Sequence, residues 1–170
     1  MLHLVTGGAR SGKSRYAQEQ ALSLSTQPVY VATAKVWDED FAQRIQRHKA
    51  ERGAAWINYE EELYVSRLPL DGQTVVIDCV TLWLTNFFAL HAYDMDKTLS
   101  AIQEEIRVLQ QKAGVFIIVT NEIGMGVHAE TAVGRRFTDL QGWVNQYIAR
   151  MADTVVLMVA GIPVVIKGEA

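Results

Sequence analysis

The sequence predicts an α/β protein with a mostly parallel central sheet flanked by helices and a β-hairpin at the carboxyl end. Three observations lead to this fold class. Short runs rich in β-branched residues alternate with longer segments of helical periodicity. Most of these runs are apolar without strict alternation, as in strands that are covered on both faces. Near the end of the chain, residues 155–160 and 164–167 flank a Gly-Ile-Pro turn and indicate the hairpin.

The expected elements follow one another in a regular order. Strands are expected at residues 2–6, 29–32, 75–78, 115–120 and 154–159, and helices at 13–24, 39–52, 81–90, 95–112 and 134–151. Strands that alternate with helices in this way form βαβ units, which place the strands in parallel. The chain shows no internal repeat, low-complexity tract or linker, so we expect residues 1–170 to form a single domain.

Composition excludes several classes of protein. The 170 residues carry a net charge of −3, and the pI is about 5.8, so neither nucleic acid nor a membrane surface is an expected partner. A single cysteine, Cys79, excludes an internal disulfide framework. Residues 1–3 lack the basic start of a signal peptide, and the apolar stretch 154–166 is short and interrupted. We therefore expect no membrane span and a cytoplasmic location.

The residues after the first expected strand match the phosphate-binding pattern G-x-x-x-x-G-K-S. They are Gly7, Gly8, Ala9, Arg10, Ser11, Gly12, Lys13 and Ser14. The motif has the context it requires, a strand before it and a helix after it. The backbone N–H groups of such a loop hold a polyphosphate, Lys13 would reach its β and γ oxygens, and Ser14 would ligate Mg²⁺. The motif predicts a P-loop NTPase (RecA-like) fold and phosphate-transfer chemistry.

An aspartate ends the expected strand at residues 75–78. A carboxylate such as that of Asp78, at the end of a strand beside a phosphate loop, can hold a water of the Mg²⁺ shell. Many buried strands end in an aspartate, so this pattern alone is a weak indication of a metal ligand. It becomes a stronger one because the sequence also contains the phosphate loop. The neighbouring Cys79 is expected to be a small core residue.

Residues 39–52 predict a helix with a basic stripe. Its acidic start and basic end complement the helix dipole. Helical spacing aligns Arg44, His48 and Arg52. Positive charge on both sides lowers the pKa expected for the imidazole, which keeps its lone pair for attack on a phosphate. From the spacing alone, a solvated basic face with an incidental histidine is the commoner alternative.

Further motifs follow in order between Leu4 and about Lys167. They are Tyr30-Val-Ala-Thr33, Arg44-Ile-Gln-Arg-His48, Asp78-Cys-Val-Thr-Leu-Trp83 with Thr85-Asn86, Thr120-Asn-Glu-Ile-Gly-Met-Gly126, Phe137-Thr-Asp-Leu-Gln-Gly142, Asn145-Gln146, Ala152-Asp153 and Val159-Ala-Gly161. Together with the phosphate loop, they resemble the bifunctional adenosylcobinamide kinase / adenosylcobinamide-phosphate guanylyltransferases of cobalamin (vitamin B12) biosynthesis. The resemblance covers nearly the whole chain.

The resemblance implies two reactions. ATP or GTP phosphorylates the hydroxyl on the aminopropanol arm of adenosylcobinamide, and GMP is then transferred from GTP to adenosylcobinamide phosphate, giving adenosyl-GDP-cobinamide and pyrophosphate. His48 would carry the GMP covalently, with Lys13 as the second catalytic residue, and the enzyme would be a homotrimer. The resemblance also implies residues that line the guanine nucleotide, namely Ala32, Thr33, Ala34, Lys49, Ala50, Glu51, Arg52 and Glu60.

One carboxylate and two rival functions remain open. Glu122, which follows an expected strand, either accepts the proton of the cobinamide hydroxyl or braces the loop at residues 124–126. The chain could also be a plain metabolite kinase, in which His48 only contacts phosphate. A nucleotide-dependent switch acting on a protein or DNA partner is the third hypothesis, and the acidic pI and short length disfavour it.

Overall fold

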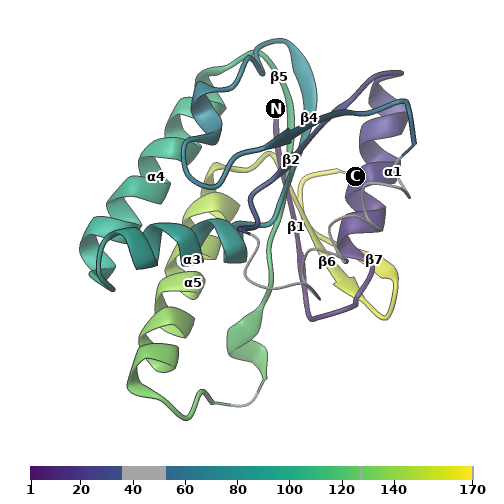
Figure 1. Ribbon diagram of the computed structural model, residues 1–170. Helices are drawn as coiled ribbons and strands as arrows, with labels where there is room; N and C mark the ends of the chain where they lie inside the picture. Colours follow the sequence, from purple (N-terminus) through teal and green to yellow (C-terminus); the bar gives the residue numbers. More distant parts are fainter. Residues whose placement is uncertain (36–52, 127, 170) are drawn as a thin grey trace.

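A seven-stranded sheet runs through the protein in the order β3-β2-β4-β5-β1-β6-β7. Figure 1 shows it in a computed structural model, which describes residues 1–35, 53–126 and 128–169. The first six strands are parallel, and β7 runs antiparallel to β6. The predicted α/β fold with a mostly parallel sheet and a carboxyl-terminal hairpin is therefore confirmed.

The strands are β1 (Leu2–Gly7), β2 (Val29–Ala32), β3 (Ile57–Glu60), β4 (Gln73–Asp78), β5 (Gly114–Val119), β6 (Thr154–Val159) and β7 (Ile162–Lys167). The helices within the described ranges are α1 (Lys13–Leu24), α3 (Val80–Leu90), α4 (Met95–Gln111) and α5 (Ala132–Met151), with short 3₁₀ turns η1 (Val65–Arg67) and η2 (Ile123–Met125). The expected elements that fall on described residues agree with these bounds to within two residues at either end. The helix expected at residues 39–52 lies outside the described residues.

Strand β3 was not expected from the sequence. It has four residues, in which half-buried positions alternate with exposed ones, and it forms the edge of the sheet beside β2. From its sequence, so short and polar a segment cannot be distinguished from a loop. It is a strand because it pairs with β2, and not because of its own composition.

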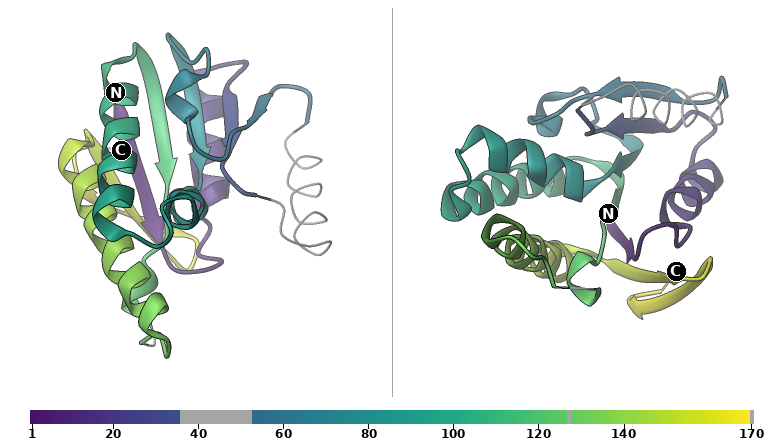
Figure 2. Two further views of the ribbon diagram at one scale, coloured as in Figure 1. Left: turned by 60° about the vertical axis from the view of Figure 1, so that its left-hand side comes forward. Right: turned by 60° about the horizontal axis from the view of Figure 1, so that its bottom comes forward.

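Two hydrophobic layers cover the sheet. Among the described helices, α3, α4 and α5 lie on one face and α1 lies on the other (Figure 2). Alternate strand residues point to opposite faces, so that Leu4 packs into the larger core and Val5 into the smaller one. Ala17 and Ala21, one turn apart, bring α1 close to the strands. None of the described helices is long and apolar enough to cross a membrane.

The parallel strands bring the ends of several motifs to one edge of the sheet. The register pairs Ala32 with both Glu60 and Asp78, and Asp78 with Val119. Strand β5, which leads to Glu122, lies between β4 and the strand that precedes the phosphate loop. In open α/β sheets, ligands bind outside this carboxyl edge.

Candidate active site

The loop between β1 and α1 curls tightly because three of its residues take positive φ values. They are Gly7 at 147°, Arg10 at 55° and Gly12 at 96°. A Cβ atom at Gly7 would lie 2.6 Å from the carbonyl oxygen of Met158, so that only glycine fits there. No side chain of the described residues caps the start of α1, which leaves its first N–H groups for an anion. A cavity of about 240 Å³ lies at this point of the loop.

Lys13 lies within the curl of this loop. Its Nζ donates hydrogen bonds to the carbonyl oxygen of Gly8 and to Ser11 Oγ, and the residue is only 7% exposed. Burial lowers the pKa of the Lys13 ammonium, and the negative charge of Asp78 opposes that shift. Oxygens of the loop itself thus accept the hydrogen bonds of Lys13, and the oxygens of a bound phosphate can take their place.

Asp78 is oriented by a tyrosine from the neighbouring strand. The Tyr30 hydroxyl donates to Asp78 Oδ2 at 2.8 Å. The Tyr30 ring in turn packs edge-on against Trp56, with ring centroids 5.9 Å apart. The contact between Tyr30 and Asp78 was not predicted from the sequence. It follows from the parallel pairing of β2 and β4, which places these two residues on one face of the sheet.

The oxygen donors at this point suit a magnesium ion. Mg²⁺ prefers carboxylate and hydroxyl oxygens and keeps several waters and phosphate oxygens of its own. Ser14, which is half-buried at the start of α1, offers a hydroxyl, and Asp78 offers a carboxylate that Tyr30 holds by one oxygen. The donor chemistry of this pair fits the ion.

The Glu122 carboxylate joins β1 to α5. Its Oε1 accepts hydrogen bonds from Thr6 Oγ1 at 2.7 Å and from Asn145 Nδ2 at 3.1 Å. Its backbone N–H donates to the carbonyl of Gly7 at 3.2 Å, which places it against the phosphate loop. Among the described residues, the carboxylate makes no hydrogen bond to the following loop, whereas the backbone carbonyl of Glu122 accepts one from the N–H of Met125 at 3.4 Å, so both alternatives for Glu122 remain open. Asn145 was missed in the sequence as a partner of Glu122.

The expected nucleotide-lining residues lie in different surroundings. Ala32 and Ala34 are half-buried, and Glu60 is exposed at the end of β3. Thr33 is fully buried, and its hydroxyl donates to the carbonyl of Cys79 at 2.8 Å, so it joins the ends of β2 and β4. His48, Lys49, Ala50, Glu51 and Arg52 lie outside the described residues.

The turn of the carboxyl-terminal hairpin is tied to the phosphate loop. The N–H of Gly161 donates to the carbonyl of Ser11 at 3.0 Å. Gly161 takes a φ of 84° and Ala160 a φ of 52°, as a tight turn between β6 and β7 requires. The hairpin therefore forms one wall of the site.

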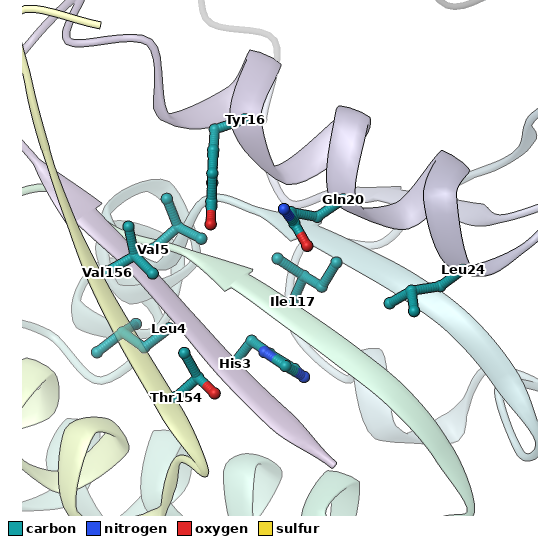
Figure 3. A pocket seen from close by; sticks show the side chains of 9 residues that line it. All are labelled: His3, Leu4, Val5, Tyr16, Gln20, Leu24, Ile117, Thr154 and Val156. Atoms are coloured by element: carbon teal, nitrogen blue, oxygen red, sulfur yellow. The ribbon is translucent and has the colours of Figure 1, made fainter. Parts of the chain in front are cut away.

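A small cavity also lies between α1 and the sheet, away from the phosphate loop. In Figure 3, Tyr16 and Gln20 point from α1 toward the strands, and His3 lines the same cavity from β1. Its volume of about 30 Å³ suits a water molecule and not a substrate. Nε2 of His3 has no hydrogen-bond partner among the described residues, and burial lowers the pKa of His3, although Asp153 acts in the opposite direction.

Comparison with known proteins identifies the family. Residues 3–166 match the sequence model described as cobinamide kinase / cobinamide phosphate guanyltransferase. The bifunctional adenosylcobalamin biosynthesis protein CobU of Salmonella typhimurium is 40% identical over 183 residues, which cover 98% of this chain and 100% of the relative. The corresponding protein CobP of Pseudomonas aeruginosa is 37% identical over 174 residues, covering 99% of each chain.

A solved structure resembles the fold at low sequence identity. The flagellar accessory protein FlaH from Methanocaldococcus jannaschii superposes with a TM-score of 0.50 at 14% identity, covering 99% of this chain and 78% of FlaH. At that identity the likeness concerns the fold alone. The family match confirms the resemblance inferred from the sequence motifs, together with the prediction of an enzyme of this bifunctional kind. The chain belongs to the cobinamide kinase / cobinamide phosphate guanyltransferase family.

Proposed function

We propose that this chain phosphorylates the aminopropanol hydroxyl of adenosylcobinamide with ATP or GTP and then transfers GMP from GTP to the resulting phosphate. The products of the second reaction are adenosyl-GDP-cobinamide and pyrophosphate. The observation that carries the proposal is the meeting of the phosphate loop, Asp78 and Glu122 at one edge of the sheet, in a chain that matches the family over residues 3–166.

In the kinase step, the phosphate loop holds the nucleotide and Lys13 stabilises the charge that develops on its β and γ oxygens. The partly buried ammonium suits this role, because a charge interacts more strongly where water is excluded. Glu122 lies against the loop and takes the proton of the cobinamide hydroxyl.

Ser14 and Asp78 are the residues that would hold Mg²⁺ beside the nucleotide. Ser14 would contribute its hydroxyl, and Asp78, whose Oδ2 accepts the hydrogen bond from Tyr30, would hold a water of the metal's shell. The ion would supply positive charge beside the phosphate oxygens, which lowers the cost of building negative charge on the leaving group.

In the guanylyl transfer, the neutral imidazole of His48 attacks the α-phosphorus of GTP and pyrophosphate leaves. An oxygen of adenosylcobinamide phosphate then attacks the same phosphorus, and His48 is released. Ala32, Thr33, Ala34, Lys49, Ala50, Glu51, Arg52 and Glu60 are proposed to line the guanine nucleotide. The family match, which includes the segment around His48, supports this scheme.

We also propose that the chain acts as a homotrimer in the cytoplasm, with residues 1–170 as one catalytic domain. Four apolar side chains of the edge strand β7 support self-association, since large apolar groups in contact with water favour burial by a partner. They are Ile162, Val164, Val165 and Ile166, with exposed fractions of 66%, 47%, 44% and 60%. Light scattering coupled to gel filtration should give a trimer for the wild type and a smaller species for Ile166→Glu.

The experiment that tests the proposed activities uses adenosylcobinamide with ATP and GTP in separate assays. Wild-type protein should form adenosylcobinamide phosphate, and with GTP it should go on to adenosyl-GDP-cobinamide. In Lys13→Ala, both rates should fall by about 100-fold or more, as when a group that stabilises developing charge is removed. The exposed Lys97→Ala is the matched control and should retain both rates. If Lys13→Ala retains guanylyl transfer, the two reactions do not use the same phosphate loop.

A further inference from the structure

A second cavity opens beside the phosphate loop. Its volume is about 420 Å³, and its walls come from the phosphate loop, from η2 and from the end of β6. Ile123, Met125, Leu157 and Val159 give it a largely apolar lining, and Glu122 is the one ionisable side chain among the described residues that line it. A cavity of this size can receive a side arm and part of a larger ligand, with the remainder lying over the open side.

The Glu122 carboxylate is held at this cavity by one oxygen. Oε1 accepts from both Thr6 Oγ1 and Asn145 Nδ2, at 2.7 and 3.1 Å. Oε2 makes no hydrogen bond to any of the described residues. A carboxylate held in this way keeps one oxygen fixed and the other available to a ligand in the cavity.

The orientation of Asn145 is determined by its other contacts. Its Nδ2 also donates to the carbonyl oxygen of Asn121 at 3.1 Å, and a carbonyl can only accept, so the amide nitrogen must lie on this side. Its Oδ1 accepts from Thr120 Oγ1 at 2.7 Å and from Gln141 Nε2 at 2.9 Å. Asn145 is 6% exposed, and Thr120 and Gln141 are also buried. A buried network of this kind holds its members in one arrangement.

We propose that this cavity is the subsite for the hydroxyl-bearing arm of the corrinoid acceptor, and that Asn145 is the positioning residue that keeps Glu122 Oε2 available to that hydroxyl. The inference rests on the kinase activity proposed above. The apolar walls accommodate the edge of the macrocycle, while Gly8 and Ser11, which also line the cavity, bring it to the loop that would hold the nucleotide's terminal phosphate.

The chemical step balances with these groups alone. The O–H bond of the acceptor breaks, and its proton passes to Glu122 Oε2. The acceptor oxygen bonds to the γ-phosphorus, and the bond from that phosphorus to the β–γ bridging oxygen breaks. ADP or GDP leaves with that electron pair.

Variants of Asn145 test the positioning role against a purely structural one. Asn145→Ala should lower kcat of the kinase step about 10- to 100-fold, with the KM for ATP unchanged, while labelling of the protein by GMP from GTP stays at the wild-type rate. Asn145→Asp places a second carboxylate beside Glu122, which should move the acidic limb of the kinase pH profile to higher pH. The exposed neighbour Gln146→Ala is the control on the same helix.

The outcomes separate the two roles. A structural role alone would lower kinase activity and GMP labelling together, in step with the melting temperature, and would leave the pH profile in place. That result, or a kinase kcat that is unchanged in both Asn145 variants, would overturn the positioning role. If wild-type protein forms the GMP adduct but never phosphorylates adenosylcobinamide, the proposed kinase function has failed instead.

Filling the cavity tests the acceptor subsite. Val159 lines the cavity and is 52% exposed, so that a larger side chain there is expected to fold. Val159→Trp should raise the KM for adenosylcobinamide at least 10-fold, with the KM for ATP and the GMP labelling unchanged. Leu22→Trp, at a 46% exposed position of α1, is the matched control. An unchanged KM for the corrinoid in Val159→Trp would place the acceptor elsewhere.

Discussion

The Tyr30 hydroxyl donates a hydrogen bond to Asp78 Oδ2 at 2.8 Å, across the boundary between two parallel strands. Tyr30 is 6% exposed and packs edge-on against Trp56, which is also 6% exposed. The contact therefore fixes the direction of the carboxylate that we propose as an outer ligand of Mg²⁺. It joins the smaller hydrophobic core directly to the chemistry at the edge of the sheet.

Removing this hydroxyl should weaken the use of Mg²⁺ without unfolding the protein. A hydrogen bond to a charged group contributes about 1.5–3 kcal/mol, part of which water recovers at a half-buried carboxylate. For Tyr30→Phe we expect the Mg²⁺ concentration at half-maximal kinase rate to rise about 3- to 10-fold, since about 1.4 kcal/mol corresponds to a factor of ten. Tyr93→Phe, at a 52% exposed position, is the control. An unchanged Mg²⁺ dependence in Tyr30→Phe would show that Tyr30 does not position Asp78 for the metal.

The single thiol of the chain should be inert in the native protein. Burial raises the pKa of Cys79 to about 12, and the negative charge of Asp78 acts in the same direction. The thiolate is the reactive form, and at pH 8 it would make up about one ten-thousandth of such a thiol. We expect labelling by a disulfide reagent to be at least 100-fold slower in native protein than in guanidinium. Equally fast labelling in both states would show that Cys79 is open to solvent.

The stability of the fold should fall in mildly acidic solution because of His3. The pKa of His3 lies below the ordinary value of 6.5 when the chain is folded and returns to that value when it unfolds. At pH values between the folded and the unfolded pKa, unfolding therefore takes up a proton. Stability is therefore fully present above about pH 6.5 and is lost as the pH falls through the folded pKa. Denaturant titrations at pH 7.5 and 5.0 should show a larger loss in the wild type than in His3→Leu.

The exposed His128→Leu serves as the comparison for that experiment. It should lose as much stability between the two pH values as the wild type does. If His3→Leu and His128→Leu behave alike, the pH dependence has another source and the His3 imidazole does not contribute.

The parts of the site that the sequence predicted are those encoded by neighbouring residues. The glycine turn, Lys13 and Ser14 form one continuous motif, and its geometry follows from glycines at positions that require positive φ. Asp78 could be inferred because an apolar strand leads to it. The main strands were found because strands covered on both faces are continuously apolar.

The parts that the sequence did not predict depend on packing between distant segments. Asn145 lies 23 residues after Glu122, on a helix whose approach to the sheet is set by the hydrophobic core and not by any local pattern. The same holds for Tyr30, which meets Asp78 from 48 residues away. The hydrogen bond from the Thr33 hydroxyl to the carbonyl of Cys79 could not be predicted either, because the two residues are brought together only by the pairing of β2 with β4.

The most direct test of the central claim is incubation with GTP labelled at the α-phosphorus. We predict a protein-bound label that is lost in acid and retained in alkali, as for a phosphoramidate at His48. Adenosylcobinamide phosphate should release it, and His48→Ala should not form it. Wild-type protein that phosphorylates adenosylcobinamide but never retains the label would contradict the covalent mechanism and favour a plain kinase.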